Sequence, residues 1–280
     1  MVRGSVVIAI RGVYHRRMPR LRLFQVDAFT SRRFAGNPAA VVPLATWLDD
    51  ETLQAIGNEN NLAETAFFVP ENDVFRLRWF TPEVEVKLCG HATLASAFVL
   101  FTELEPGRQE VRYETLSGQV GVRSAGDRLV LDFPRWSIDT PDEVPDVLLE
   151  ALDAKPVEVL STAEGGNFLV VLGRESDVRA LSPDFDLLST LDAGVIVTAP
   201  GARCDCVCRY FAPSFGVDED HATGSIHCAL APYWAERLRR NTVHSRQLSP
   251  RGGELFCEVI GHRVEIGGRA VKYLDGWIDI

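Results

Sequence analysis

The chain has 280 residues, of which 46% are hydrophobic and 24% are charged, and its formal net charge is −10. This length and composition are typical of a globular protein with two hydrophobic cores. The acidic balance argues against nucleic acid as a partner, and no apolar run approaches the roughly 20 residues that cross a membrane.

Residues 1–20 are predicted to be an N-terminal extension. They carry five arginines and no acid, and their apolar run at 6–10 is too short for the core of a signal peptide. A translation start at Met18 would remove most of them. Without a secretory signal, the six cysteines are expected to be reduced and the protein to be cytoplasmic.

The first half of the chain is predicted to combine several strands with two helices. A short helix begins at a cap formed by Asp49 or Asp50 and ends at Gly57 and Asn58. The second helix, at 92–101, is apolar on nearly every side and must therefore be buried. Alternation and strand-forming composition predict strands at 21–29, 39–43, 61–70, 74–80, 119–122 and 128–133.

The second half follows a similar plan after a polar passage at 138–145. Cys204, Cys206 and Cys208 alternate along one predicted strand, which places three thiols on one face. Buried thiols are favoured there over a metal site, which usually shows Cys-x-x-Cys pairs. Helices are predicted at 145–153 and 185–191, strands at 168–172, 195–198 and 204–211, and a turn at 247–255 that feeds the last strands.

Short motifs recur in the same order about 130 positions apart, which indicates an internal duplication. The matched pairs are 36–37 with 166–167, 70 with 200, 78–82 with 209–213, and 91–93 with 221–223. Two similar domains related by an approximate twofold axis are therefore expected, and strands around one apolar helix in each unit make the fold class α+β. The N-terminal domain is placed at 21–134, alone or with roughly the last ten residues of the chain. The C-terminal domain is placed at 135–280.

Two loops of small residues each lead into an apolar helix, one at 89–93 and the other at 219–225. A helix start leaves unpaired backbone N–H groups at the positive end of the helix dipole, where a carboxylate can bind. We expect the two junctions to face each other and to form one site for a small anionic substrate. The residues expected to bind it there are Gly90, Ala92, Gly224 and Ser225.

Two carboxylates break the duplication. Glu64 matches Gly194 at an offset of 130, and Asp220 matches Gly90 at the same offset, so each unit brings an acid that the other lacks. Glu64 is flanked by apolar residues, which favours a functional role over that of a surface acid. Asp220 is equally compatible with a functional acid and with a helix N-cap.

Five segments together resemble the motif set of the PhzF family of phenazine biosynthesis-like isomerases, which has the diaminopimelate epimerase-like fold. These segments are 24–29, 36–41, 63–67, 88–93 and 219–225. The resemblance implies two pseudo-symmetric domains, each a β-barrel-like sheet wrapped around a central helix, with the active site in the cleft between them. It also implies an isomerase that needs no cofactor and no metal ion, and that is commonly a homodimer.

The resemblance also implies site residues. The family's catalytic glutamate, active-site histidine, aspartate and serine fall on Glu64, His91, Asp220 and Ser225. Asn37 and His221 complete the expected substrate-binding set. His221 stands where the family usually has proline, and Ile226 stands where it usually has alanine. His221 could add a titrating group at the mouth of the site, so the resemblance does not assign the substrate.

The expected reaction is a proton shift on a carboxylic acid. Glu64 would take a proton from one carbon and return it to another, while the helix starts stabilise the developing negative charge. Two other functions remain open, a thiol-dependent enzyme that uses Cys89 and a non-catalytic protein that binds small acids. Racemisation by two thiols is not expected, because His221 occupies the place of the second cysteine in the related amino-acid epimerases.

Overall fold

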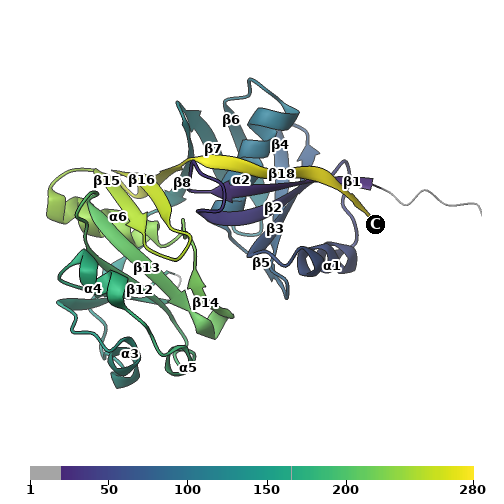
Figure 1. Cartoon of the computed structure of the whole chain (residues 1–280). Coiled ribbons are helices and arrows are strands. Elements are labelled where there is room, and N and C mark those ends of the chain that lie inside the picture. The colour runs from purple at the N-terminus through teal and green to yellow at the C-terminus, as the bar shows by residue number, and fades with distance from the viewer. Residues whose placement is uncertain (1–19, 165) are drawn as a thin grey trace, which may run out of the picture.

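The computed structural model describes residues 20–164 and 166–280. The predicted extension therefore lies outside the described residues, except for Arg20, which begins the first strand. The described residues form two lobes, which lie side by side in Figure 1. No helix in this part of the chain is long and apolar enough to cross a membrane.

The sheet of the first lobe is built mainly from antiparallel strand pairs. Among its described strands only two pairs are parallel, Asn37–Pro43 with Glu64–Glu71 and Val74–Phe80 with Glu110–Thr115. The two-residue strand β5 (Glu85–Val86) pairs with the outer part of β4. In spatial order the main strands are β18 (Ala270–Asp279), β1 (Arg20–Ala28), β2 (Asn37–Pro43), β3 (Glu64–Glu71), β4 (Val74–Phe80), β6 (Glu110–Thr115), β7 (Gly118–Ala125) and β8 (Arg128–Pro134).

The helix α2 (Gly90–Val99) lies inside this sheet and continues into a π-helical turn, Leu100–Leu104. Every residue of α2 except Phe98 is buried, as its all-round apolar sequence predicts. The hydroxyls of Thr93 and Ser96 donate to backbone carbonyls one turn earlier, so their burial leaves no unpaired group.

The helix α1 (Asp50–Asn60) packs on the outside of the first lobe and is capped by the Asp49 carboxylate, as predicted. The predicted end at Gly57 and Asn58 is wrong, because the helix continues to Asn60. Gly57 instead lies against Phe80, where a Cβ would approach the Phe80 Cβ to 3.0 Å. The glycine therefore serves close packing within the helix rather than its termination.

The second lobe wraps a sheet around α6 (His227–Leu238) in the same way. Among its described strands only two pairs are parallel, Asn167–Val171 with Gly194–Pro200 and Cys206–Ala212 with Thr242–Gln247. The helices α3 (Asp146–Leu152), α4 (Glu175–Ala180) and α5 (Phe185–Leu188) lie on its outside. Its strands are β9 (Ile138–Asp139), β10 (Glu158–Thr162), β11 (Asn167–Val171), β12 (Gly194–Pro200), β13 (Cys206–Ala212), β14 (Val217–Asp220), β15 (Thr242–Gln247), β16 (Gly253–Ile260) and β17 (Arg263–Gly268).

Two predictions for the second lobe need correction. The helix predicted at 185–191 ends at Leu188, since the following residues form turns. The strand predicted at 204–211 begins at Cys206, so it carries two buried thiols, Cys206 and Cys208, rather than three. Cys204 lies in the preceding loop, where its thiol donates to the Cys206 carbonyl at 3.2 Å.

The duplication is visible in the pairing of strands and in one repeated ion pair. Thr65 pairs with Phe80 in β3–β4, and the offset equivalents Val195 and Phe211 pair in β12–β13. In each lobe an arginine of the long strand contacts a glutamate of its short neighbour through two hydrogen bonds. These pairs are Arg78 with Glu85 at 2.7 and 2.7 Å, and Arg209 with Glu219 at 2.7 and 2.8 Å. The predicted α+β fold with two pseudo-symmetric halves is confirmed.

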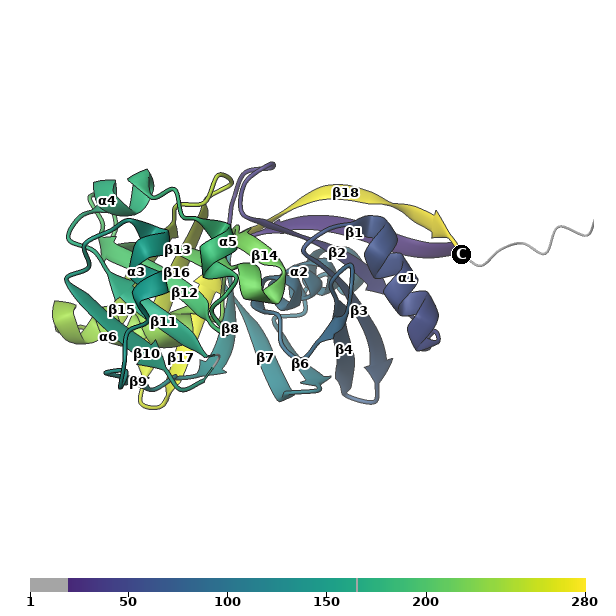
Figure 2. The same ribbon diagram turned by 90° about the horizontal axis from the view of Figure 1, so that it is seen from below.

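The lobes are joined by strands as well as by the chain. β8 of the first lobe pairs antiparallel with β17 of the second, so one continuous sheet runs through both. The chain then returns to the first lobe, where β18 pairs with β1 from Arg20 to Ala28, as Figure 2 shows. The predicted domain boundaries at 134 and 135 stay predictions.

Candidate active site

The two predicted junctions meet at a pair of glycines. A Cβ on Gly90 would lie 3.5 Å from the Gly224 Cα, and a Cβ on Gly224 would lie 3.6 Å from the Gly90 Cα. A Cβ at Gly90 would make an ordinary van der Waals contact, whereas a Cβ at Gly224 would crowd the Phe29 ring at 3.2 Å. The first loop leads directly into α2, whereas the second passes through a tight turn, in which the His227 N–H donates to the Gly224 carbonyl, before α6 begins.

A cavity of about 660 Å³ opens beside this contact and is lined by both lobes. Six of the predicted site residues line it, namely Glu64, Gly90, His91, Asp220, Gly224 and Ser225. Ala92, Asn37 and His221 do not line it, so their predicted contact with a substrate has no support from this geometry. His221 instead donates its backbone N–H to Asp220, and burial is the main cause that lowers the pKa of its imidazole.

Glu64 is the first residue of β3 and projects its carboxyl group toward His91. Its Oε2 lies 3.0 Å from the His91 Nε2. The two groups are not aligned as a hydrogen bond, and both atoms are buried without another partner among the described residues. At the equivalent position of the second lobe, a Cβ on Gly194 would approach the Asn167 Oδ1 to 2.3 Å and the Tyr210 hydroxyl to 2.4 Å, so these side chains would have to move.

His91 is buried near the start of α2, between three polar groups. Its Nδ1 lies 3.2 Å from the Asn37 Nδ2 and 3.5 Å from the Cys89 Sγ. The two hydrogens of the Asn37 amide are donated to Asp220 at 2.7 Å and to the Ala222 carbonyl at 3.0 Å, so the longer contact with Nδ1 does not fix the tautomer of the ring. Burial lowers the pKa of His91, but the neighbouring Cys89 and Glu64 outweigh it and raise the pKa. The raised pKa favours the protonated ring, in which Nε2 carries a hydrogen on the side of Glu64.

Asp220 ends β14 and is held by donors from both lobes. Its Oδ1 accepts from the Asn37 amide at 2.7 Å and from the His221 backbone N–H at 2.9 Å. Its Oδ2 accepts from the Thr223 hydroxyl at 2.5 Å. The N-cap alternative is wrong, because α6 begins only at His227. Asn37 therefore connects the Asp220 carboxylate to the His91 ring, and through it to Glu64.

The structural counterpart of Asp220 differs from the predicted one. In β4–β5 Trp79 pairs with Val86, and in β13–β14 the equivalent Tyr210 pairs with Asp220. Val86, not Gly90, is therefore the counterpart of Asp220. The repeated His-Ala-Thr letters are also not equivalent in structure, since 91–93 lie in α2 and 221–223 in the loop before α6. The expected asymmetry of the two acids still holds.

Comparisons with known proteins identify the family. A family model described as phenazine biosynthesis-like protein, PhzC-PhzF, matches residues 26–276. The chain belongs to the PhzF family. It is 51% identical to a protein of Pseudomonas aeruginosa named an uncharacterized isomerase, over 93% of this chain and 99% of that one.

Solved structures of the PhzF family agree with the fold. A PhzF family protein of Enterococcus faecalis has 42% identity and a TM-score of 0.89, with 94% of this chain and 100% of that chain covered. A hydroxyproline epimerase of Agrobacterium vitis, at 12% identity and a TM-score of 0.59, shares only the fold, over 95% and 94% of the two chains.

Cys89 lies in the same cluster of side chains as Glu64 and His91. Each of the three offers one ligand atom within 4.8 Å of the others, a set that could in principle hold a metal ion. The Cys89 Sγ lies 3.5 Å from the Nδ1 of the imidazole, and the Glu64 Oε2 lies 3.0 Å from its Nε2. Burial, with Glu64 adding to it, raises the pKa of the Cys89 thiol to about 11. The thiol is therefore neutral at pH 7, although it lies at a helix start.

Sequence reasoning missed two residues of this candidate site. Gln247 is buried, accepts from the Thr223 N–H at 2.8 Å and donates to the Asp220 carbonyl at 2.8 Å, so it fixes the 220–225 loop. Nothing in its own sequence context indicates this contact. Tyr210 lines the cavity and donates to Asn167 at 3.0 Å, while burial and Asp220 raise its pKa to about 12. The sequence did contain an indication of Tyr210, because a tyrosine stands there in place of Trp79 in the duplicated motif.

Proposed function

We propose that this PhzF family member is an isomerase that moves a proton between carbons of a small carboxylic acid, with Glu64 as the acid and base and without a cofactor. The observation that carries the proposal is the Glu64 carboxyl group in a cavity that is also lined by two abutting loops, one leading into α2 and the other reaching α6 through a turn. The name isomerase given to the Pseudomonas aeruginosa relative supports the reaction class.

The two helix-start loops would bind the carboxylate of the substrate. Cys89 caps α2 without a side-chain hydrogen bond, so the first N–H groups of this helix remain available to a ligand. Gly90 and Gly224 allow the two loops to approach one anion together. In a chain with a net charge of −10, such local donors and helix dipoles must supply the attraction for an anionic substrate.

Glu64 would remove a proton from the carbon next to the bound carboxylate. The charge that develops spreads into this carboxylate, where the backbone N–H groups stabilise it. Glu64, now protonated, returns the proton to a second carbon of the same substrate, so a single group acts as base and then as acid. The N–H of His91 at 3.0 Å would hold the Glu64 carboxyl group in place between the two transfers.

Exchange of protons with solvent tests this assignment. The protein is incubated in deuterated water with a pool of carboxylic acids, and mass spectrometry identifies the acid that gains deuterium. In Glu64→Gln the exchange rate should fall by at least about a hundredfold, while binding of that acid remains. Unchanged exchange in Glu64→Gln would refute the role of Glu64. Binding without exchange in the wild-type protein would point to the alternative of a non-catalytic acid binder.

Two parts of the proposal concern the assembled protein. We expect a homodimer in solution, from the resemblance to the PhzF family, and a cytoplasmic location, from six cysteines that all remain free thiols. Size-exclusion chromatography with light scattering would measure the first. A monomer at micromolar concentration would contradict it without affecting the assignment of Glu64.

A further inference from the structure

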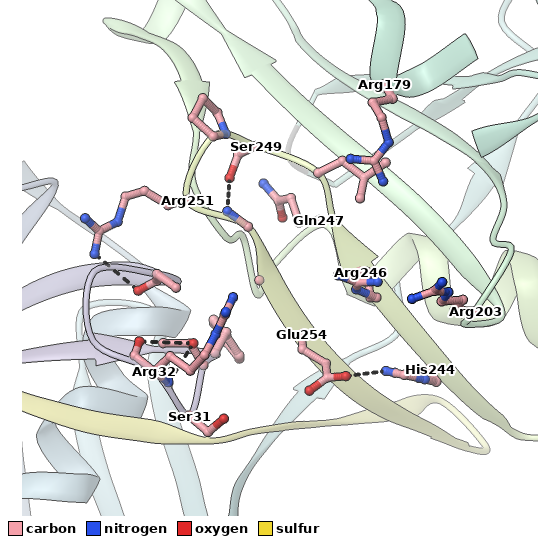
Figure 3. A pocket seen from close by; sticks show the side chains of 17 residues that line it. Ser31, Arg32, Arg179, Arg203, His244, Arg246, Gln247, Ser249, Arg251 and Glu254 are labelled. Carbon is pink, nitrogen blue, oxygen red and sulfur yellow. Dashed lines mark hydrogen bonds and ion pairs between the residues drawn. The ribbon is translucent and has the colours of Figure 1, made fainter. Parts of the chain in front are cut away.

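A second cavity, of about 330 Å³, lies where the β15–β16 turn meets the first lobe. It shares no lining residue with the cavity that contains Glu64. Five arginines line it, namely Arg32, Arg179, Arg203, Arg246 and Arg251. Figure 3 shows Arg179, Arg203 and Arg246 gathered on one side, with Arg32 on the other.

Three of the five arginines lack a compensating carboxylate among the described residues, whereas Arg179 contacts Glu175 at 2.6 Å and Arg251 contacts Asp27 at 2.8 Å. The only carboxylate among its described lining residues is Glu254, which already contacts His244 at 2.9 Å and Arg269 at 3.2 Å. Arg32, Arg203 and Arg246 form no ion pair with any described residue. So dense a positive cluster is unexpected in a chain with a net charge of −10.

Four separate segments bring these side chains together. Arg32 comes from the β1–β2 loop, Arg179 from the end of α4, Arg203 from the β12–β13 loop and Arg246 from β15. Convergence of like charges from distant parts of the chain costs electrostatic free energy, which a bound anion offsets.

The fifth arginine serves to fix the wall of the cavity. Arg251 donates to the Asp27 carboxylate at 2.8 Å and to the Gly36 carbonyl at 2.8 Å, so it ties the β15–β16 turn to the first lobe. The same turn also holds the 219–225 loop, since the Ser249 hydroxyl donates to the His221 carbonyl at 2.6 Å. The cavity therefore has a rigid wall on which exposed guanidinium groups can act together.

We propose that this cavity binds a small anion of two or more negative charges, such as a phosphate ester or a polycarboxylate. Guanidinium groups match both phosphate and carboxylate through paired N–H donors, and three unpaired arginines match an anion of this charge. A singly charged carboxylate, as proposed for the substrate, would leave most of this charge uncompensated. The site is therefore separate from the catalytic cavity in both place and ligand.

Isothermal titration calorimetry at constant ionic strength tests the proposal, with inorganic pyrophosphate and citrate as probes. The double variant Arg203→Ala/Arg246→Ala should weaken binding by about a hundredfold, about tenfold for each guanidinium lost. The control Arg76→Ala/Arg112→Ala removes the same charge from the first lobe outside both cavities and should bind like the wild-type protein. The probe that binds with the higher affinity shows whether the cavity prefers phosphate or carboxylate groups.

The location of the anion is tested separately. Glu64→Gln should bind the tighter probe with unchanged affinity, because Glu64 does not line this cavity. Equal affinity in the two double variants, absence of binding by both probes, or loss of binding in Glu64→Gln would overturn the proposal. Failure of the proposed function would appear instead as unchanged solvent exchange in Glu64→Gln, so the two failures are distinguishable.

Discussion

Replacement of Asn37 by alanine should destabilise the protein and slow proton exchange, whereas the equivalent change at Asn167 should affect mainly stability. Asn37 is fully buried and donates to the Asp220 carboxylate at 2.7 Å and to the Ala222 carbonyl at 3.0 Å. Loss of a bond to a charged group costs about 2 kcal/mol, and the orphaned carbonyl adds about 1 kcal/mol. The total of about 3 kcal/mol would lower the thermal midpoint by roughly 8 °C.

Asn167 provides the matched control because it occupies the duplicated position in the second lobe. It is also buried, but its Oδ1 accepts only from the neutral Tyr210 hydroxyl, at 3.0 Å. Asn167→Ala should therefore cost about 1 kcal/mol, which corresponds to a fall of roughly 3 °C. In this variant His91 and Asp220 remain in place, so deuterium exchange into the substrate should stay near the wild-type rate.

The two variants are compared by calorimetric melting at pH 7 and by deuterium exchange into the substrate. In Asn37→Ala the His91 ring and the Asp220 carboxylate lose their common anchor, and exchange should slow by about a hundredfold. Equal midpoints for the two variants, or full exchange in Asn37→Ala, would refute the role of Asn37 as the link between the lobes.

Two further changes test the remaining chemistry of the core. Cys89→Ala should retain exchange within a few-fold of wild type, because a thiol with a pKa of about 11 is protonated at pH 7; loss of exchange would indicate a thiol-dependent enzyme. Burial lowers the pKa of His227 to about 4, so the unfolded chain, with a pKa near 6.5, binds the proton first. About 3 kcal/mol of stability present above pH 6.5 should be lost as the pH falls toward 4. Urea melts of His227→Gln should show a flatter dependence over this range, and an unchanged slope would contradict the assignment.

The fold and the pairing of the two junctions could be predicted because they depend on local patterns. The apolar character of 92–101 requires burial whatever surrounds it, and a glycine in each of the two loops permits the contact between Gly90 and Gly224. The capping of α1 by Asp49 was predictable for the same reason, since a cap acts within its own turn.

The rest of the site depends on register between distant segments, which single-sequence patterns do not contain. The letters His-Ala-Thr repeat at a constant offset, yet the second copy lies in a loop, so Asp220 corresponds to Val86. Gln247 reaches the 220–225 loop only because β15 pairs with β13. The arginine cavity was likewise invisible, since its members come from four separated parts of the chain.

The two acids of the cavity are suited to different tasks, which favours a single shuttling base. Asp220 already accepts three hydrogen bonds, from Asn37, His221 and Thr223, which occupy most of the acceptor sites of its carboxylate. Glu64 keeps a buried oxygen without an aligned partner, and His91 holds it on one side. A pair of bases acting from opposite faces would need two equally free groups at equivalent positions of the duplication. The place that matches Glu64 holds Gly194, which carries no ionisable group and packs against the Asn167 and Tyr210 side chains.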